Sequence, residues 1–129
     1  MVSYSKRHGT ISGLGLSRRF QCGAGSGVIS VDPFGNVYPC HALHQQEFLC
    51  GNVLTGDLKK IYDSKPMRIC RETTVDSKKE CSSCDLKYVC GGGCLATTYK
   101  LYGSLKARNE LLCPFYRKIA IDSLWDSTR

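Results

Sequence analysis

The chain has 129 residues, of which 42% are hydrophobic, so it has the size of a single domain with a limited apolar core. Its formal net charge of +7 comes from basic residues scattered as doublets such as Arg18-Arg19, which argues against a nucleic-acid-binding surface. The sequence has no apolar run of membrane-spanning length and no apolar segment near its start that would suit a secretory signal, so we expect a cytoplasmic protein without a membrane partner.

Residues 1–21 mix Ser, Gly and basic residues, and we interpret them as a tail or as a linker from a missing domain, followed by one domain at residues 22–129. A β-hairpin is expected over residues 28–39, because β-forming residues flank an Asp-Pro-Phe-Gly turn in which Gly35 takes a positive φ. Pro39 cannot donate to a β-ladder, so the second strand should end there or lie at a sheet edge.

A helical pattern begins at Thr55, and either Thr55 or Asp57 can cap it. Its shared face is expected to carry Leu58, Ile61 and Tyr62. A further short turn should point Met67 and Ile69 inward, and residues 72–80, which are mostly polar, are expected to form a loop.

Two helices are expected in the C-terminal third. One covers residues 94–102 and stops at Gly103, and the other starts near Pro114 and runs through Trp125. A set of six aromatic side chains falls largely within the helices predicted along the chain, and we expect them to pack in the core rather than to stack on bases. They are Tyr62, Tyr99, Tyr102, Phe115, Tyr116 and Trp125.

The number of cysteines, nine, argues against a scaffold built only on disulfides, because an odd number leaves one thiol unpaired in such a scaffold. Seven of them form an ordered array, Cys22-x12-Gly35-x4-Cys40, then Cys81-x2-Cys84-x5-Cys90-x3-Cys94, then Cys113. Thiolates at such short spacing are typical of a soft metal centre. Gly91–Gly93 fills the last short interval, and glycines there allow positive φ and a close backbone approach.

Spacing alone leaves two kinds of metal open. Zinc could be held in one four-thiolate site by Cys81, Cys84, Cys90 and Cys94, and in a second by Cys22, Cys40 and Cys113 with His41 or His44. For His41 a surface or structural role is favoured. Iron–sulfur clusters accept ligands from more distant segments, so the isolated Cys113 suits them better.

The whole array resembles the seven-cysteine signature of the SPASM domain, the C-terminal extension of many radical SAM enzymes that modify peptides and proteins. The similarity covers roughly residues 20–120 and includes further marks around the cysteines, at Gly35–His41, Gly51–Val53, Val89–Cys94 and Cys113–Tyr116. It implies a small α+β fold with a β-hairpin and short helices organised around two [4Fe-4S] clusters.

The resemblance also implies which cysteines bind which cluster. The first cluster would take Cys22, Cys40 and Cys94, and the second Cys81, Cys84, Cys90 and Cys113. Some members of the family add a fourth ligand before the first of these cysteines, where this chain has Leu16-Ser17-Arg18-Arg19. The first cluster would then have an open iron site or recruit another group. Cys50 and Cys70 lie outside the signature, and a partly buried thiol is favoured for each over a fourth ligand.

In function, the resemblance implies the auxiliary-cluster domain of a radical SAM peptide-modifying oxidoreductase, serving electron transfer, peptide anchoring or both. Its partners would be a radical SAM barrel in cis or trans, a peptide or protein substrate, and an electron donor such as a flavodoxin or ferredoxin. The Cys-x3-Cys-x2-Cys motif is absent, since Thr97 stands three residues after Cys94, so S-adenosylmethionine chemistry would belong to a missing domain and the chain alone should not be catalytic. The alternatives are a zinc-binding structural or interaction module, and a stand-alone iron–sulfur electron carrier or peptide-binding adaptor.

Overall fold

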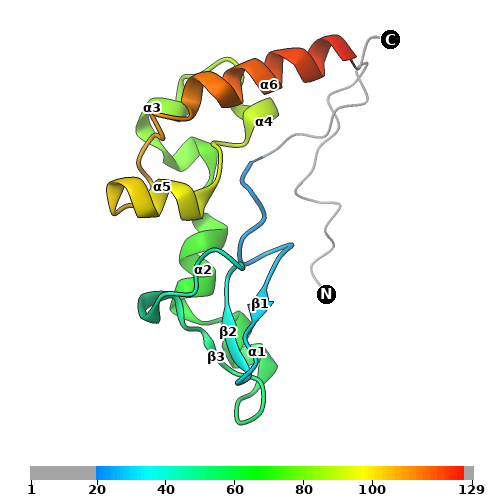
Figure 1. Ribbon diagram of the computed structural model, residues 1–129, viewed down its shortest axis with the longest axis vertical. Helices are drawn as coiled ribbons and strands as arrows, with labels where there is room; N and C mark the ends of the chain where they lie inside the picture. Colours follow the sequence, from blue (N-terminus) through cyan, green and yellow to red (C-terminus); the bar gives the residue numbers. More distant parts are fainter. Residues whose placement is uncertain (1–19, 127–129) are drawn as a thin grey trace. The chain divides into compact units, whose positions relative to one another are not determined.

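The computed structural model describes residues 20–126, drawn in colour in Figure 1, so all but the end of the predicted tail at residues 1–21 lies outside the described residues. Internal contacts divide the described residues into two compact units. The sheet unit is Gly23–Thr73, and the helical unit contains residues 20–22 and 74–126. The α+β class expected from the sequence is confirmed.

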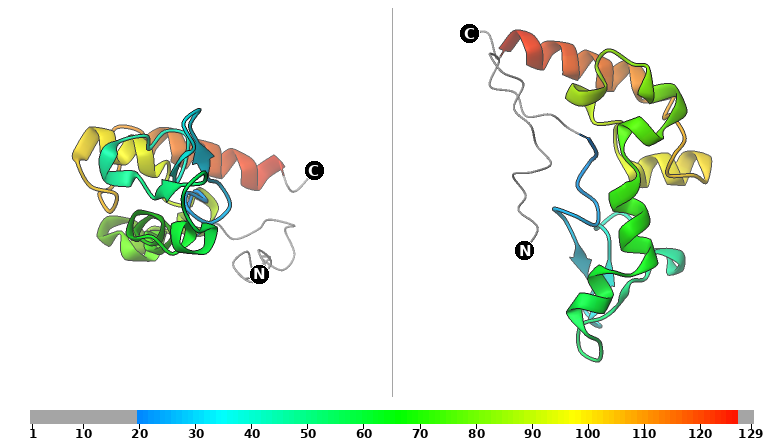
Figure 2. Two further views of the ribbon diagram at one scale, coloured as in Figure 1. Left: turned by 90° about the horizontal axis from the view of Figure 1, so that it is seen from below. Right: turned by 180° about the vertical axis from the view of Figure 1, so that it is seen from behind.

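The sheet unit is built on three short antiparallel strands in the order β1-β2-β3, visible from two sides in Figures 1 and 2. They are β1 (Ser30–Val31), β2 (Asn36–Tyr38) and β3 (Gly51–Asn52). The predicted hairpin is confirmed, with Val31 opposite Val37 and with Gly35 at a φ of +85° in the turn. β2 ends just before Pro39, as expected, but it is the central strand because β3 pairs with its other edge.

Asn52 on β3 fixes the hairpin turn from the side. Its Nδ2 donates to the carbonyl of Phe34 at 2.9 Å and to Oδ1 of Asn36 at 3.0 Å. Within the turn, the backbone N–H groups of Phe34 and Asn36 both donate to the Asp32 carboxylate at 2.9 Å. Desolvation alone would raise the pKa of Asp32, but the Asn36 side-chain amide, which donates to Oδ2 at 2.9 Å, and these backbone N–H groups outweigh it, so the net pKa is lowered. The turn is thus tied together by side chains rather than by its backbone alone.

Short helices complete the sheet unit: η2 (Gln46–Phe48), α1 (Leu58–Tyr62) and α2 (Lys65–Glu72). Asp57 caps α1 by accepting from the N–H of Lys59, as expected. The three residues of the predicted face differ in burial, since Ile61 is buried while Leu58 and Tyr62 are exposed. One turn and a half of helix buries little, and here Ile61 alone reaches the core cluster that includes Val37.

In α2 the inward residues are Met67 and Cys70, which lie three positions apart and so share a helix face. Met67 was predicted correctly. The prediction for Ile69 is wrong, because it lies two positions from Met67 and its side chain is 39% exposed. The unit therefore buries a cysteine where an isoleucine was expected.

The helical unit contains η3 (Val75–Ser77), α3 (Lys79–Ser82), α4 (Lys87–Cys90), α5 (Leu95–Tyr102) and α6 (Cys113–Asp126). Residues 72–80 are not the loop that was expected, because they include the end of α2, all of η3 and the start of α3. Val75 and Lys78 in this segment are buried, and the polar composition hid these two anchors. The two C-terminal helices are confirmed, with Gly103 at φ +67° ending α5.

α6 packs against α4, and both views in Figure 2 show it as a long straight rod. Within α6 only Ala120 is buried, and its apolar residues Phe115, Ile119, Ile121 and Trp125 are exposed. The expectation that the aromatic residues lie in the core is therefore wrong for most of them, since Tyr62, Tyr102, Phe115 and Trp125 are exposed. Tyr99 and Tyr116 are half-buried. None of the helices between residues 20 and 126 is long and apolar enough to cross a membrane.

Candidate metal centre

Four cysteines line one cavity of about 280 Å³ in the helical unit. Cys81 lies on α3, Cys84 between α3 and α4, Cys90 at the end of α4, and Cys113 at the start of α6. Cys94 does not line this cavity. The structure thus brings together the set that the resemblance gave to the second cluster, and separates Cys94 from it; that the set holds a cluster stays a prediction.

Tight turns bring these thiols to the same cavity. The N–H of Cys84 donates to the carbonyl of Cys81 at 3.0 Å, and the N–H of Lys87 donates to the carbonyl of Cys84 at 3.1 Å. These overlapping turns reverse the chain within a few residues. Two cysteines three positions apart can therefore face one space, as the Cys-x2-Cys spacing indicated.

The Gly91–Gly93 triplet has the conformation that the sequence predicted. All three residues have positive φ, between 72° and 78°. A Cβ at Gly93 would lie 2.6 Å from Cε2 of Tyr116, and one at Gly92 would lie 3.0 Å from Cγ1 of Val75. The triplet is thus required both by its backbone angles and by packing against side chains of α6 and η3.

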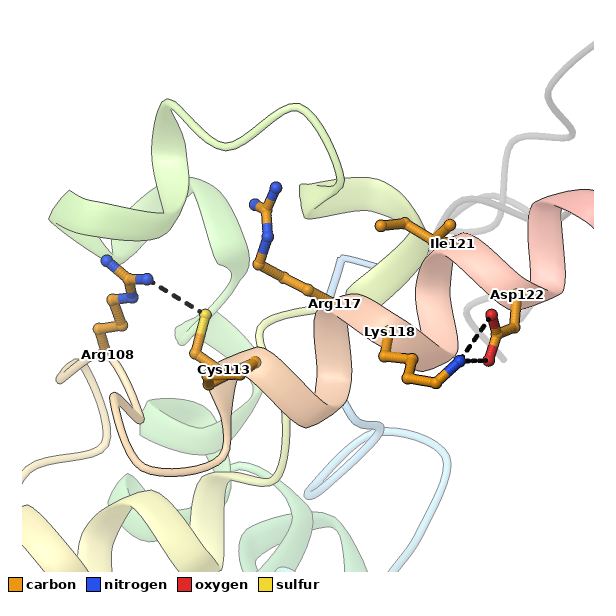
Figure 3. A pocket seen from close by; sticks show the side chains of 7 residues that line it. Arg108, Cys113, Arg117, Lys118, Ile121 and Asp122 are labelled. Carbon is orange, nitrogen blue, oxygen red and sulfur yellow. Dashed lines mark hydrogen bonds and ion pairs between the residues drawn. The ribbon is translucent and has the colours of Figure 1, made fainter.

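Two arginines donate hydrogen bonds to sulfur atoms at the cavity. Arg108 Nη2 donates to Sγ of Cys113 and Arg117 Nη1 donates to Sγ of Cys84, both at 3.3 Å. Figure 3 shows Arg108 reaching Cys113 across a shallow hollow of about 520 Å³ beside the cavity, with the Lys118–Asp122 ion pair at its far end. Hydrogen bonds to ligand sulfur disperse thiolate charge. The sequence gave no local signal for either contact.

The electrostatics of Cys81 show how crowded the thiols are. Burial is the largest cause that raises the pKa of Cys81, and the thiolates of Cys113, Cys90 and Cys84 raise it further. Lys78 acts in the opposite direction. Four thiolates that repel one another around a cavity are what a bound metal cation would stabilise.

Asn109 supplies a further sign that the cavity fits a ligand. It lines the cavity and is only 4% exposed, and its Oδ1 accepts from the N–H of Leu112 at 3.0 Å. Its Nδ2 is buried and has no hydrogen-bond partner among the residues that the structure describes. A buried donor without an acceptor is costly, and an iron–sulfur cluster would offer sulfur acceptors in this cavity.

The sulfur ligands at the cavity suit a soft metal centre. All nine cysteines lie within residues 20–126 and none forms a disulfide. No group of three or more His, Cys, Asp or Glu side chains in that range is gathered closely enough to hold a single metal ion. Four of the thiols line one cavity, and an iron–sulfur cluster accepts ligands from such separate segments.

The residues assigned to the first cluster are divided between the two units. Cys22 and Cys94 lie in the helical unit and Cys40 lies in the sheet unit, so their convergence stays a prediction. Cys94 precedes α5. Burial would raise the pKa of its thiol, but the hydroxyl and N–H of Thr97 and the N–H of Ala96 donate to it, and the net pKa is lowered.

The two histidines and the cysteine considered as further metal ligands lie outside the cavity. His44 Nε2 and Ser30 Oγ form a hydrogen bond of 2.8 Å, and the His44 ring stacks on Tyr38 with ring centroids 4.3 Å apart. His41 is exposed. Cys50 donates to the carbonyl of Phe48 at 3.3 Å, and burial raises the pKa of its thiol.

Comparisons with known proteins agree with this chemistry. Residues 22–85 match the SPASM family, described as an iron–sulfur cluster-binding domain, and this match includes four of the seven cysteines of the array. The chain is 38% identical to the mycofactocin maturase MftC of Mycobacterium ulcerans over 93 residues, which are 70% of this chain and 23% of that protein. It is 37% identical to the mycofactocin maturase MftC of Mycolicibacterium smegmatis over 93 residues, which are 70% of this chain and 22% of that protein.

An uncharacterized protein of Archaeoglobus fulgidus is 28% identical over 104 residues, which are 80% of this chain and 24% of that protein. This chain thus spans about a quarter of the length of the curated relatives that it matches. The family match, the identity to the maturases and the thiol-lined cavity agree on one chemistry. The chain therefore belongs to the SPASM family of iron–sulfur cluster-binding domains.

Proposed function

We propose that this chain is the auxiliary-cluster domain of a radical SAM enzyme that modifies a peptide, and that it holds two [4Fe-4S] clusters. The observation that carries the proposal is the cavity lined by Cys81, Cys84, Cys90 and Cys113. The maturases that the chain resembles support a peptide as the substrate. The zinc alternative grouped Cys94 with Cys81, Cys84 and Cys90, and Cys94 does not line this cavity, which favours the cluster.

Each residue at the cavity has a role in this proposal. The four cysteines bind iron as thiolates, and the guanidinium groups of Arg108 and Arg117 donate charged hydrogen bonds to the sulfurs of Cys113 and Cys84. Asn109 offers its buried Nδ2 as a further donor. A bound [4Fe-4S] cluster supplies one-electron transfer. The protein adjusts that transfer through hydrogen bonds and charge around the sulfurs.

For the first cluster, we propose Cys22, Cys40 and Cys94 as ligands. The thiol of Cys94 suits this role because the Thr97 hydroxyl, together with backbone N–H groups at the start of α5, lowers its pKa. Three cysteines leave one iron position for another group, and a thiolate or amide of the peptide substrate has suitable chemistry. This domain would then anchor the peptide as well as transfer electrons.

The radical chemistry itself requires a partner. The 129 residues contain no Cys-x3-Cys-x2-Cys motif, so the radical SAM barrel is supplied elsewhere in the same protein or by a second chain. Electrons would come from a small redox protein of the flavodoxin or ferredoxin class.

The proposal is tested by counting iron and sulfide in the chain purified and reconstituted without oxygen. Two clusters require about eight iron and about eight sulfide per chain. Cys113→Ala should lose about half of both, and Cys50→Ala, as the matched control, should lose none. Zinc without sulfide in the wild-type protein would falsify the cluster assignment. About four iron per wild-type chain would show one cluster and overturn the proposal that the chain holds two.

A further inference from the structure

Lys78 is the one charged residue that the described part of the chain buries, at 1% exposure. It is also the largest of the fully buried side chains in that part. Burying an ammonium group is unfavourable unless anionic or hydrogen-bonding groups surround it. A lysine in this position therefore requires a physical explanation.

The side chain of Lys78 connects two segments that carry cysteines. Its Nζ donates to the carbonyl of Gly92 at 3.0 Å, in the middle of the glycine triplet between Cys90 and Cys94. A Cβ at Gly92 would lie 3.6 Å from both Cδ and Nζ of the lysine, so the side chain passes along the glycine backbone. The carbonyl of Lys78 accepts from the N–H of Cys81 at 3.0 Å, at the start of α3.

The negative charges around Lys78 come from cysteines. Neither of the two ion pairs found among the described residues, Lys87–Asp76 and Lys118–Asp122, involves it. Burial lowers the pKa of Lys78, and the groups that oppose this effect most strongly are the thiolates of Cys81, Cys22, Cys90 and Cys94. The lysine thus lies within electrostatic reach of two cysteines from each of the two proposed ligand sets.

We infer that Lys78 is an internal counter-charge for the iron-bound thiolates, and that it favours the reduced state of the clusters that this domain holds. The inference rests on the proposed function, because it requires the clusters. Reduction adds one electron from an external reductant and no proton, so it adds one negative charge near the ammonium group. A fixed positive charge stabilises that product and raises the midpoint potential.

The expected size follows from burial. A unit charge inside the protein at an effective dielectric constant of about 20 changes the ratio of reduced to oxidised cluster by roughly tenfold or more at a fixed applied potential. An exposed charge is screened by water and salt and changes it far less. Lys79 is the matched comparison, since it is the next residue along the chain and is exposed.

The test is an anaerobic redox titration of the reconstituted 129-residue chain with dithionite, followed by electron paramagnetic resonance. Lys78→Met and Lys78→Gln remove the charge, Lys78→Arg keeps it, and Lys79→Met removes an exposed charge nearby. We expect both neutral variants at position 78 to lower the midpoint potential, by an amount equal to a tenfold or greater loss of reduced cluster at fixed potential. Lys78→Arg and Lys79→Met should stay near the wild type.

Iron and sulfide contents separate failure of the inference from failure of the proposed function. If the wild-type chain holds no cluster, the proposed function fails. If the wild-type chain holds clusters and the neutral variants have the same midpoint potential as the wild type, Lys78 is not a counter-charge. Should neither neutral variant retain iron, full iron in Lys78→Arg supports the inference, because charge is then what assembly needs. A lower iron content or a lower midpoint potential in Lys78→Arg as well would show a steric role and overturn the inference.

Discussion

Arg117 on α6 donates a hydrogen bond to Sγ of Cys84, a residue 33 positions earlier, at 3.3 Å. Arg108 makes the equivalent contact with Cys113 at the same distance. Each arginine therefore connects a candidate iron ligand to the segment around α6, and each adds a positive charge at the rim of the cavity. The cavity has cations both at its rim and, in Lys78, in the interior beside it.

Arg117→Gln should lower the midpoint potential of the cluster held at this cavity, because the variant loses a charged donor to sulfur. The contact is exposed and screened by solvent, so its contribution is at most about 1 kcal/mol, below the usual range for charged hydrogen bonds. A redox titration should show up to roughly a fivefold loss of reduced cluster at fixed potential. Lys118→Gln is the control, since Lys118 is the next residue and pairs with Asp122 instead. Equal effects of the two variants would mean that only net charge matters.

Gly93→Ala should destabilise the helical unit more than Gly103→Ala does. Both glycines have positive φ, +72° and +67°, so both variants incur backbone strain of roughly 1 kcal/mol or more. Only the alanine at position 93 would also meet a neighbour, 2.6 Å from Cε2 of Tyr116, whereas nothing lies within 4 Å at position 103. Urea unfolding of the cluster-loaded proteins measures the difference. Equal midpoints would show that Tyr116 moves aside without cost.

Asn109→Asp isolates the buried amide donor at the cavity. Aspartate keeps the oxygen that accepts from the N–H of Leu112, so the turn before α6 is retained, but it lacks the Nδ2 donor. We expect a more negative midpoint potential or a lower iron content, since a carboxyl group would face the cluster sulfurs. Glu110→Gln is the control, because Glu110 is exposed and does not line the cavity. A wild-type potential and iron content in Asn109→Asp would show that Nδ2 has no cluster partner.

The features that could be predicted from the sequence are those with strong local signals. Glycine and proline marked the turn at Gly35, the end of β2 and the end of α5. The cysteine spacing, together with the family resemblance, grouped the four cysteines that line the cavity. In each case the residues that define the feature are close in sequence or belong to a recurring pattern.

The features that were missed depend on contacts between distant residues. β3 is only two residues long, and it is a strand because Gly51 and Asn52 pair with β2. A strand this short has no hydrophobic periodicity from which it could be predicted. Residues 72–80 are mostly polar in sequence, yet Lys78 is buried within electrostatic reach of thiolates, three of which (Cys22, Cys90 and Cys94) lie in other segments of the chain. Arg108 and Arg117 resembled ordinary surface arginines, because their partners could be seen only after folding.

Cys50 and Cys70 provide the last prediction, which concerns the fourth position of the first cluster. Cys70 on α2 is 0% exposed, and Cys50 is partly buried against the core cluster of Val37, Ile61 and Met67. Both lie where a small apolar side chain packs well. We expect Cys50→Ala and Cys70→Ala each to keep the wild-type iron and sulfide content while losing about 1 kcal/mol of stability from the smaller side chain.

Cys40→Ala is the matched comparison for these two variants, because Cys40 is also buried in the sheet unit but is a proposed ligand. It should lower the iron content, whereas the other two should lower only the midpoint of urea unfolding. Loss of iron in Cys50→Ala or Cys70→Ala alone would identify that cysteine as the fourth ligand and leave no open position for a substrate. Retained iron in both variants leaves that position to a group from outside the cysteine array, as substrate anchoring requires.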